Sequence, residues 1–259
     1  MSDAPALVSA CAQLVMVKAQ LDDWLVEGAA RGEQRSLSGD GYSAWRRWRE
    51  SQPWPYVSPG DFHGSPWREG VPEPRHFLTK VFPWADFRAV RFGSAPTEQG
   101  GCPQVEVDSS LVVGGLWHRP YEHDLRGDPP TVLGKINESG GAQYARVGAL
   151  PLYAAIEGKN RVSLAQRLRL PLVAEVAVAA FPEAGRLRLH RARALDAVAV
   201  AVSHVDSGEL HFLPLPEEAT AVLAAYGVPW DNRVIGTRGG HQEALDTARK
   251  CLLGRTLRR

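Results

Sequence analysis

Glu157, Gly158, Lys159, Asn160 and Arg161 follow one another between an apolar segment and a segment of helical spacing. A helix that begins directly after a strand presents unpaired backbone N–H groups and the positive end of its dipole. Gly158 lets a ligand approach the backbone closely, and Asn160 can cap the helix or bind an oxygen. Lys159 and Arg161 add positive charge at the same place. These features are typical of a phosphate-binding turn.

Glu157 would repel a bare phosphate, so it is better suited to holding Mg²⁺ or to orienting a hydroxyl or water. An ordinary structural explanation accounts for the same residues, namely a capped helix with a surface salt bridge. The chemistry of the residues alone leaves these two interpretations equal.

Other groups carry weaker signals. His118 and His123 flank Glu122 and could ligate a metal, but no third ligand is evident nearby. Residues 236–242 (GTRGGHQ) are glycine-rich before a predicted helix but lack the Gly-Lys-Ser/Thr ending of a P-loop. They are therefore interpreted as a loop and helix N-cap.

The turn lies between a predicted strand, residues 150–158, and a predicted helix, residues 161–170. The other predicted strands are residues 105–117, with a turn near Ser109 and Gly114, and residues 171–181, 186–193 and 197–205. The other predicted helices after residue 200 are residues 217–227 and 241–254. A hairpin is predicted at residues 206–208, and neither Ser163 nor His204 lies in a nucleophile motif. Strands and helices mix without strict alternation, so the predicted class is α/β or α+β.

The order strand, acidic-Gly-x-x-Arg, helix ending in L-x-L-P, and strand resembles the ParB/sulfiredoxin superfamily. Upstream, residues 116–125 (LWHRPYEHDL) are similar to the strand-end segment of that family with its acid, and a short predicted helix at 132–138 follows. The resemblance covers residues 104–180, about a third of the chain. It implies a ParB/sulfiredoxin-like mixed sheet with flanking helices.

Position by position, the resemblance implies a set of phosphate-binding residues. These are Gly158, Lys159, Asn160, Arg161 and Arg119. It further implies catalytic carboxylates at Glu122 and Glu157, of which Glu157 would hold Mg²⁺. Lys159 stands where sulfiredoxins carry their cysteine, so cysteine sulfinate reduction is not expected. The patterns typical of chromosome-partitioning clamps are absent and no helix-turn-helix follows residue 180, so sequence-specific partition-site binding is not expected either.

The first hundred residues differ in composition from the rest of the chain. Residues 5–31 predict one amphipathic helix packed on the main domain. Residues 38–100 combine many prolines with tryptophans, which predicts an irregular but ordered arm over the core. In this arm Arg46, Arg47 and Arg49 alternate with tryptophans, a weak signal for nucleic-acid contacts and equally well explained by Arg–Trp packing.

Bulk composition narrows the function little. The chain has 259 residues, 44% hydrophobic and 23% charged, with a formal net charge of +1, so charge gives no argument for nucleic acid or anionic lipid. Cys11, Cys102 and Cys251 form no CxxC pair, so we expect a cytoplasmic protein without a disulfide framework or zinc site. No segment reaches membrane-spanning length without charge, so no membrane partner is expected.

The expected organisation is a helix and arm at residues 1–100, a ParB/sulfiredoxin-like domain at 101–182, and strands and helices at 183–259 that complete the same globule. The resemblance implies binding and Mg²⁺-dependent hydrolysis of ATP or CTP in a DNA-associated role, such as plasmid or chromosome maintenance, a nuclease, or control of DNA transfer. Two alternatives stay open. One is a small-molecule phosphotransferase of the same fold, and the other is a catalytically silent module that docks on a protein through its Trp-rich arm.

Overall fold

The computed structural model describes residues 4–30, 74–92, 104–114, 131, 134, 137, 141–194, 197–213 and 215–235. Within their helices and strands, the side chains are described except at residues 21–30, 160, 192–199 and 233–235. The described residues form four α-helices and two mixed β-sheets. The predicted mixed class of helix and sheet is therefore confirmed.

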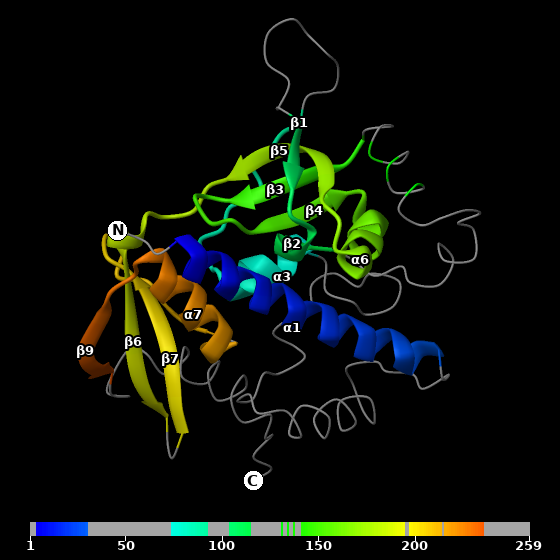
Figure 1. The fold of residues 1–259 in the computed structure, drawn as a ribbon. Coiled ribbons are helices and arrows are strands. Elements are labelled where there is room, and N and C mark those ends of the chain that lie inside the picture. Colours follow the sequence, from blue (N-terminus) through cyan, green and yellow to red (C-terminus); the bar gives the residue numbers. More distant parts are fainter. Residues whose placement is uncertain are drawn as a thin grey trace, which may run out of the picture.

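The first sheet has the strand order β1-β5-β3-β4-β2 (Figure 1). Its strands are β1 (Gln104–Val107), β2 (Val112–Val113), β3 (Gln143–Val147), β4 (Tyr153–Glu157) and β5 (Leu172–Ala179). Strand β4 runs antiparallel to β3 and parallel to β2, while β3 runs parallel to β5. Helix α6 (Lys159–Leu168) connects β4 to β5, which confirms the predicted strand–turn–helix–strand order.

The second sheet has the order β8-β7-β6-β9. Its strands are β6 (Leu187–Ala194), β7 (Ala197–His204), β8 (Leu210–Phe212) and β9 (Trp230–Ile235). Helix α7 (Pro216–Tyr226) links β8 to β9, which pairs in parallel with β6. Strands β6 and β7, the hairpin that follows and α7 were predicted; β9 was not. The predicted helix at 241–254 lies outside the described residues.

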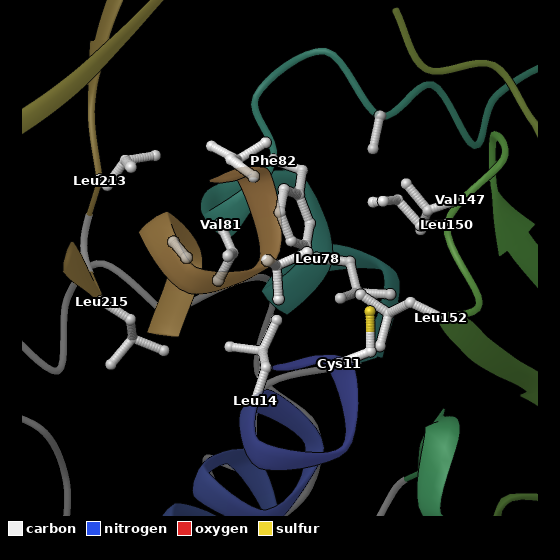
Figure 2. Close-up of a cluster of buried hydrophobic side chains, with 14 of the residues drawn as sticks. Cys11, Leu14, Leu78, Val81, Phe82, Val147, Leu150, Leu152, Leu213 and Leu215 are labelled. Carbon is white, nitrogen blue, oxygen red and sulfur yellow. The ribbon is translucent and has the colours of Figure 1, made fainter. Parts of the chain in front are cut away.

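One hydrophobic core joins the two sheets. Helices α1 (Ala4–Ala30) and α3 (Pro74–Val81) contribute Leu14, Phe77 and other fully buried side chains to it. Leu152 before β4 and Leu189 on β6 belong to the same cluster, so both sheets pack against the same helices. Figure 2 shows part of this core, with residues of α1, α3 and the β3–β4 turn pointing toward one another. Burial raises the pKa of the Cys11 thiol in this cluster to about 12.

Within the predicted irregular arm, residues 74–81 form a regular helix instead. The proline that signals irregular structure elsewhere is the first residue of α3, where its missing N–H is not needed. The chain after α3 is attached to the second sheet, because Trp84 Nε1 donates to Glu209 Oε2 at 3.1 Å. None of the described helices combines the length and apolarity required to span a bilayer.

Candidate functional site

The strand-to-helix turn is built on a glycine. Gly158 has φ +77° and is the N-cap of α6, directly after the end of β4. A Cβ at this position would lie 3.2 Å from Ala142 Cβ, so the left-handed backbone favours glycine and the space for any side chain is tight. The structure corrects the sequence interpretation in one respect: Gly158 is the cap, and Asn160 is already inside the helix.

The first turn of α6 carries the charges that a helix dipole disfavours. Lys159 and Arg161 lie there, no acidic residue does, and no side chain caps the helix. Helix α7 starts conventionally, with Glu217 and Glu218 in its first turn. A cation in the first turn is unfavourable by roughly 0.3–1 kcal/mol at an exposed position. A bound anion would reverse the sign of this effect.

Arg161 turns back over the start of β3. A Cβ added to Gly141 would lie 4.0 Å from Arg161 Nη2. A Cβ added to Gly158 would lie 3.5 Å from Arg161 Cδ. The backbone N–H of Arg161 donates to the Gly158 carbonyl at 3.0 Å. Arg161 and Lys159 are both half-buried. The guanidinium therefore lies close to the glycine turn and to the beginning of the neighbouring strand.

Beneath this end of α6 lies a residue that the sequence did not single out. Tyr144 on β3 is completely buried between the sheet and α6, and its hydroxyl has no hydrogen-bond partner among the residues that the structure describes. Burial raises the pKa of Tyr144 above its usual range, and the positive charge of Arg161 acts in the opposite direction. A buried hydroxyl without a partner costs about 1–3 kcal/mol. A ligand oxygen or a water that reached it would remove that cost.

Glu157 ends β4 and is exposed. Strand alternation places it on the same face of the sheet as Ala155, which packs under α6. Among the residues that the structure describes, no group of three or more His, Cys, Asp or Glu side chains is placed to hold a metal. Mg²⁺ is commonly bound through one or two carboxylates and the phosphates of its nucleotide, so Glu157 could act as one of these carboxylates.

The end of strand β2 lies next to α6. Strand β2 runs parallel to β4, so the carboxyl ends of both strands lie at the same edge. Directly after β2, Gly114 approaches α6 so closely that a Cβ there would lie 2.8 Å from Val162 Cβ. Gly114 therefore lies beside the helix whose first turn carries Lys159 and Arg161, and Glu122 itself lies outside the described residues.

Several predicted residues lie outside the described part of the chain. These are Arg46, Arg47, Arg49, His118, Arg119, Glu122 and His123. The short helix predicted at 132–138 is described at three positions, Thr131, Gly134 and Asn137, all of which are helical. Asn137 Oδ1 accepts a long contact of 3.5 Å from the Val173 N–H, so Asn137 lies against the start of β5.

The site thus consists of a glycine turn, a helix N-terminus with two basic residues, an exposed carboxylate and a buried tyrosine hydroxyl. Such a set can bind an oxyanion through N–H groups and positive charge. In comparisons with known proteins, no family model, no curated protein and no solved structure matches this chain.

Proposed function

We propose that the turn between β4 and α6 binds the phosphate groups of a nucleoside triphosphate together with Mg²⁺. The observation that carries the proposal is the position of Arg161, in the first turn of α6 and against the glycine turn, from which its positive charge acts on the buried hydroxyl of Tyr144. Without an anion, Arg161 and Lys159 oppose the helix dipole and the tyrosine hydroxyl is left unsatisfied. A phosphate group at the turn would reverse the first effect, and a phosphate oxygen that reached the tyrosine hydroxyl would also remove the second.

We propose a nucleoside triphosphate as the ligand because the strand–turn–helix sequence resembles ParB/sulfiredoxin domains. ATP and CTP are therefore the first candidates. Lys159, Arg161 and the N–H groups of the first turn would neutralise the phosphates. Glu157 would share Mg²⁺ with the phosphate oxygens or orient a water for hydrolysis. A DNA-associated role follows from the same resemblance, and phosphate release measured with and without DNA tests it.

Thermal unfolding with ATP, CTP and GTP, each with and without Mg²⁺, tests the proposal. A ligand that binds only the folded protein stabilises it by about 2.7 kcal/mol when present at about 100 times its Kd. For a chain of this size, that corresponds to a rise in Tm of roughly 5–10 °C. Inorganic triphosphate reports on the phosphate groups alone. If none of these compounds raises Tm at millimolar concentration, the proposal is wrong.

Replacing Tyr144 by phenylalanine distinguishes the effect of the buried hydroxyl on stability from its effect on ligand binding. Without ligand, we expect Tyr144→Phe to leave the free energy of unfolding unchanged or to raise it by about 1 kcal/mol, because an unpartnered hydroxyl is removed. The same change should weaken triphosphate binding by about tenfold if the hydroxyl contacts the ligand. Chemical denaturation and calorimetric titration measure the two effects.

Tyr226 supplies the matched control. Its hydroxyl donates to the Pro182 carbonyl at 3.2 Å, so Tyr226→Phe removes a hydrogen bond that is already made. We expect this control to lose about 0.5–1.5 kcal/mol of stability and to bind the ligand normally. Loss of stability in Tyr144→Phe together with unchanged binding would show that the Tyr144 hydroxyl has a structural partner and no role in the site.

A further inference from the structure

A second constellation of reactive side chains lies on the other sheet, away from the β4–α6 turn. His190 on β6 stands between Ser203 on β7 and Asp231 on β9. His190 Nε2 is 2.7 Å from Ser203 Oγ, and His190 Nδ1 is 3.7 Å from Asp231 Oδ2. A hydroxyl, an imidazole and a carboxylate therefore lie in a row across three neighbouring strands.

Strand register sets this arrangement. His190 is the direct partner of Asp231, whereas Ser203 is the direct partner of Arg188, two residues before His190. Leu187 and Leu189 belong to the common core, so alternation places Arg188 and His190 on the opposite face of the sheet. Ser203 and His190 are thus diagonal neighbours on that face, a separation that a histidine side chain can bridge.

The protonation state of the His190 imidazole is suited to a general base. Burial lowers the pKa of His190, the charge of Asp231 on β9 raises it, and the charge of Arg188 on β6 lowers it further. The net direction is downward, so the ring is neutral at pH 7. Asp231 favours the proton on Nδ1, which has no hydrogen-bond partner among the described atoms, and Nε2 is then left to accept from the serine hydroxyl.

We propose that Ser203, His190 and Asp231 form a nucleophile, base and carboxylate site that cleaves acyl esters. Ser203 Oγ attacks the acyl carbon and forms a C–O bond, while its proton moves to His190 Nε2. The ester C–O bond then breaks, and the leaving alkoxide takes that proton as an alcohol. Water, deprotonated by His190, hydrolyses the acyl-serine to the carboxylic acid and restores the hydroxyl. The cycle consumes only ester and water.

Access and geometry are compatible with this chemistry. Ser203 is half-exposed, while the His190 side chain is only 10% exposed and the Asp231 side chain 34%. The 3.7 Å separation between Nδ1 and the carboxylate is longer than a hydrogen bond. Such contacts often tighten when substrate is bound. Among the described residues, the serine is therefore more accessible than the imidazole that acts as its base.

Stabilisation of the oxyanion would have to come from a side chain. The backbone N–H groups that follow Ser203 are already used, because those of His204 and Val205 donate to carbonyl oxygens at 2.9 Å and 2.8 Å. Arg188 lies opposite Ser203 on the same face, and its Nη1 is fixed by the carbonyls of Gly185 and Leu187. Its positive charge would favour the oxyanion. An oxyanion is usually stabilised by two backbone N–H donors, and here a single side chain would take their place. We therefore expect slow turnover, limited to reactive esters such as p-nitrophenyl acetate.

Labelling with a fluorophosphonate tests the nucleophile directly. In this reaction the serine Oγ–P bond forms, the P–F bond breaks with loss of fluoride, and the proton again passes to His190. We expect mass spectrometry to find the label on Ser203, and Ser203→Ala to abolish it. The labelling rate should fall as pH drops through the pKa of His190, which burial lowers from its usual range. A wild-type protein that is not labelled at Ser203 would overturn the proposal.

Two variants and one control keep the test informative. General-base catalysis contributes about 10²–10⁴-fold, so His190→Gln should slow labelling by about 100-fold or more. If that buried substitution prevents folding, Asp231→Asn at the half-exposed position should still slow labelling about tenfold or more. Ser207, which is exposed in the same hairpin and accepts a hydrogen bond from the backbone N–H of Glu209, is the control, and Ser207→Ala should be labelled at the wild-type rate. Labelling of a folded His190→Gln or Asp231→Asn variant at the wild-type rate would show that the serine is not activated.

Discussion

Replacing Phe77 by alanine should lower the free energy of unfolding by about 3–5 kcal/mol, because a fully buried aromatic ring is lost and a cavity is left in the core. The cluster around Phe77 contains residues of both sheets. We therefore expect amide hydrogen exchange to accelerate by a similar factor in β3 of the first sheet and in β6 of the second. Chemical denaturation gives the size of the effect.

Phe87 provides the comparison, since it is half-buried and packs only at the border of the same cluster. Phe87→Ala should lose clearly less stability than Phe77→Ala. If Phe77→Ala loosens one sheet while the other keeps its protection, the two sheets are separate folding units and the common core does not couple them.

Replacing Gly158 by alanine should both destabilise the protein and abolish ligand binding at the turn. An L-residue in the left-handed region costs about 1–2 kcal/mol, and the added Cβ would also press on Ala142 at 3.2 Å. Relief of both effects requires the turn to move, which displaces the first N–H groups of α6. Denaturation and triphosphate titration of the same variant measure the two consequences.

Two other glycines serve as controls that distinguish the cost of the left-handed backbone from the cost of the close Cβ contact. Gly208 has φ +68° but open space around it, so Gly208→Ala carries only the backbone penalty. Gly185 has open space and no positive φ, so Gly185→Ala should be close to neutral. The expected order of destabilisation is Gly158, then Gly208, then Gly185, with binding lost only in the first. Normal ligand binding by Gly158→Ala would show that the turn geometry is not needed.

The sequence predicts the turn and its helix well because the determinants are local. A glycine between an apolar run and a stretch of 3.6-residue periodicity is enough to locate the junction of β4 and α6. Helix α7 is likewise marked by its own residues, from Pro216 at the start to Gly227 in the left-handed conformation at the end.

Strands β3 and β9 were missed because their pairing is decided elsewhere in the chain. β3 has only five residues, which is too short for a clear period, and lies between β4 and β5 through contacts distant in sequence. β9 reads WDNRVI, with polar residues at consecutive positions, and its parallel pairing with β6 contains a register shift. Such strands are stabilised by their neighbours more than by their own propensity.

The same reason explains which functional residues were missed. Tyr144 lies on β3, so its position under α6 could not be inferred before that strand was placed. The contact between Ser203 and His190 depends on the register of β6 with β7, and the approach of Asp231 depends on the position of β9. No short motif marks these three residues, because they are neighbours across strands and not along the chain.

Calorimetric titration of Mg·ATP and Mg·CTP into the wild-type protein, Arg161→Ala and Arg167→Ala tests the central claim most directly. Both arginines belong to α6, but Arg161 lies in its first turn and Arg167, which is exposed, in its last. A hydrogen bond to a charged group contributes about 1.5–3 kcal/mol, so we expect Arg161→Ala to weaken binding by about tenfold or more and Arg167→Ala to leave it unchanged. Equal affinities in all three proteins, or no binding by the wild type, would contradict a phosphate site at the start of α6.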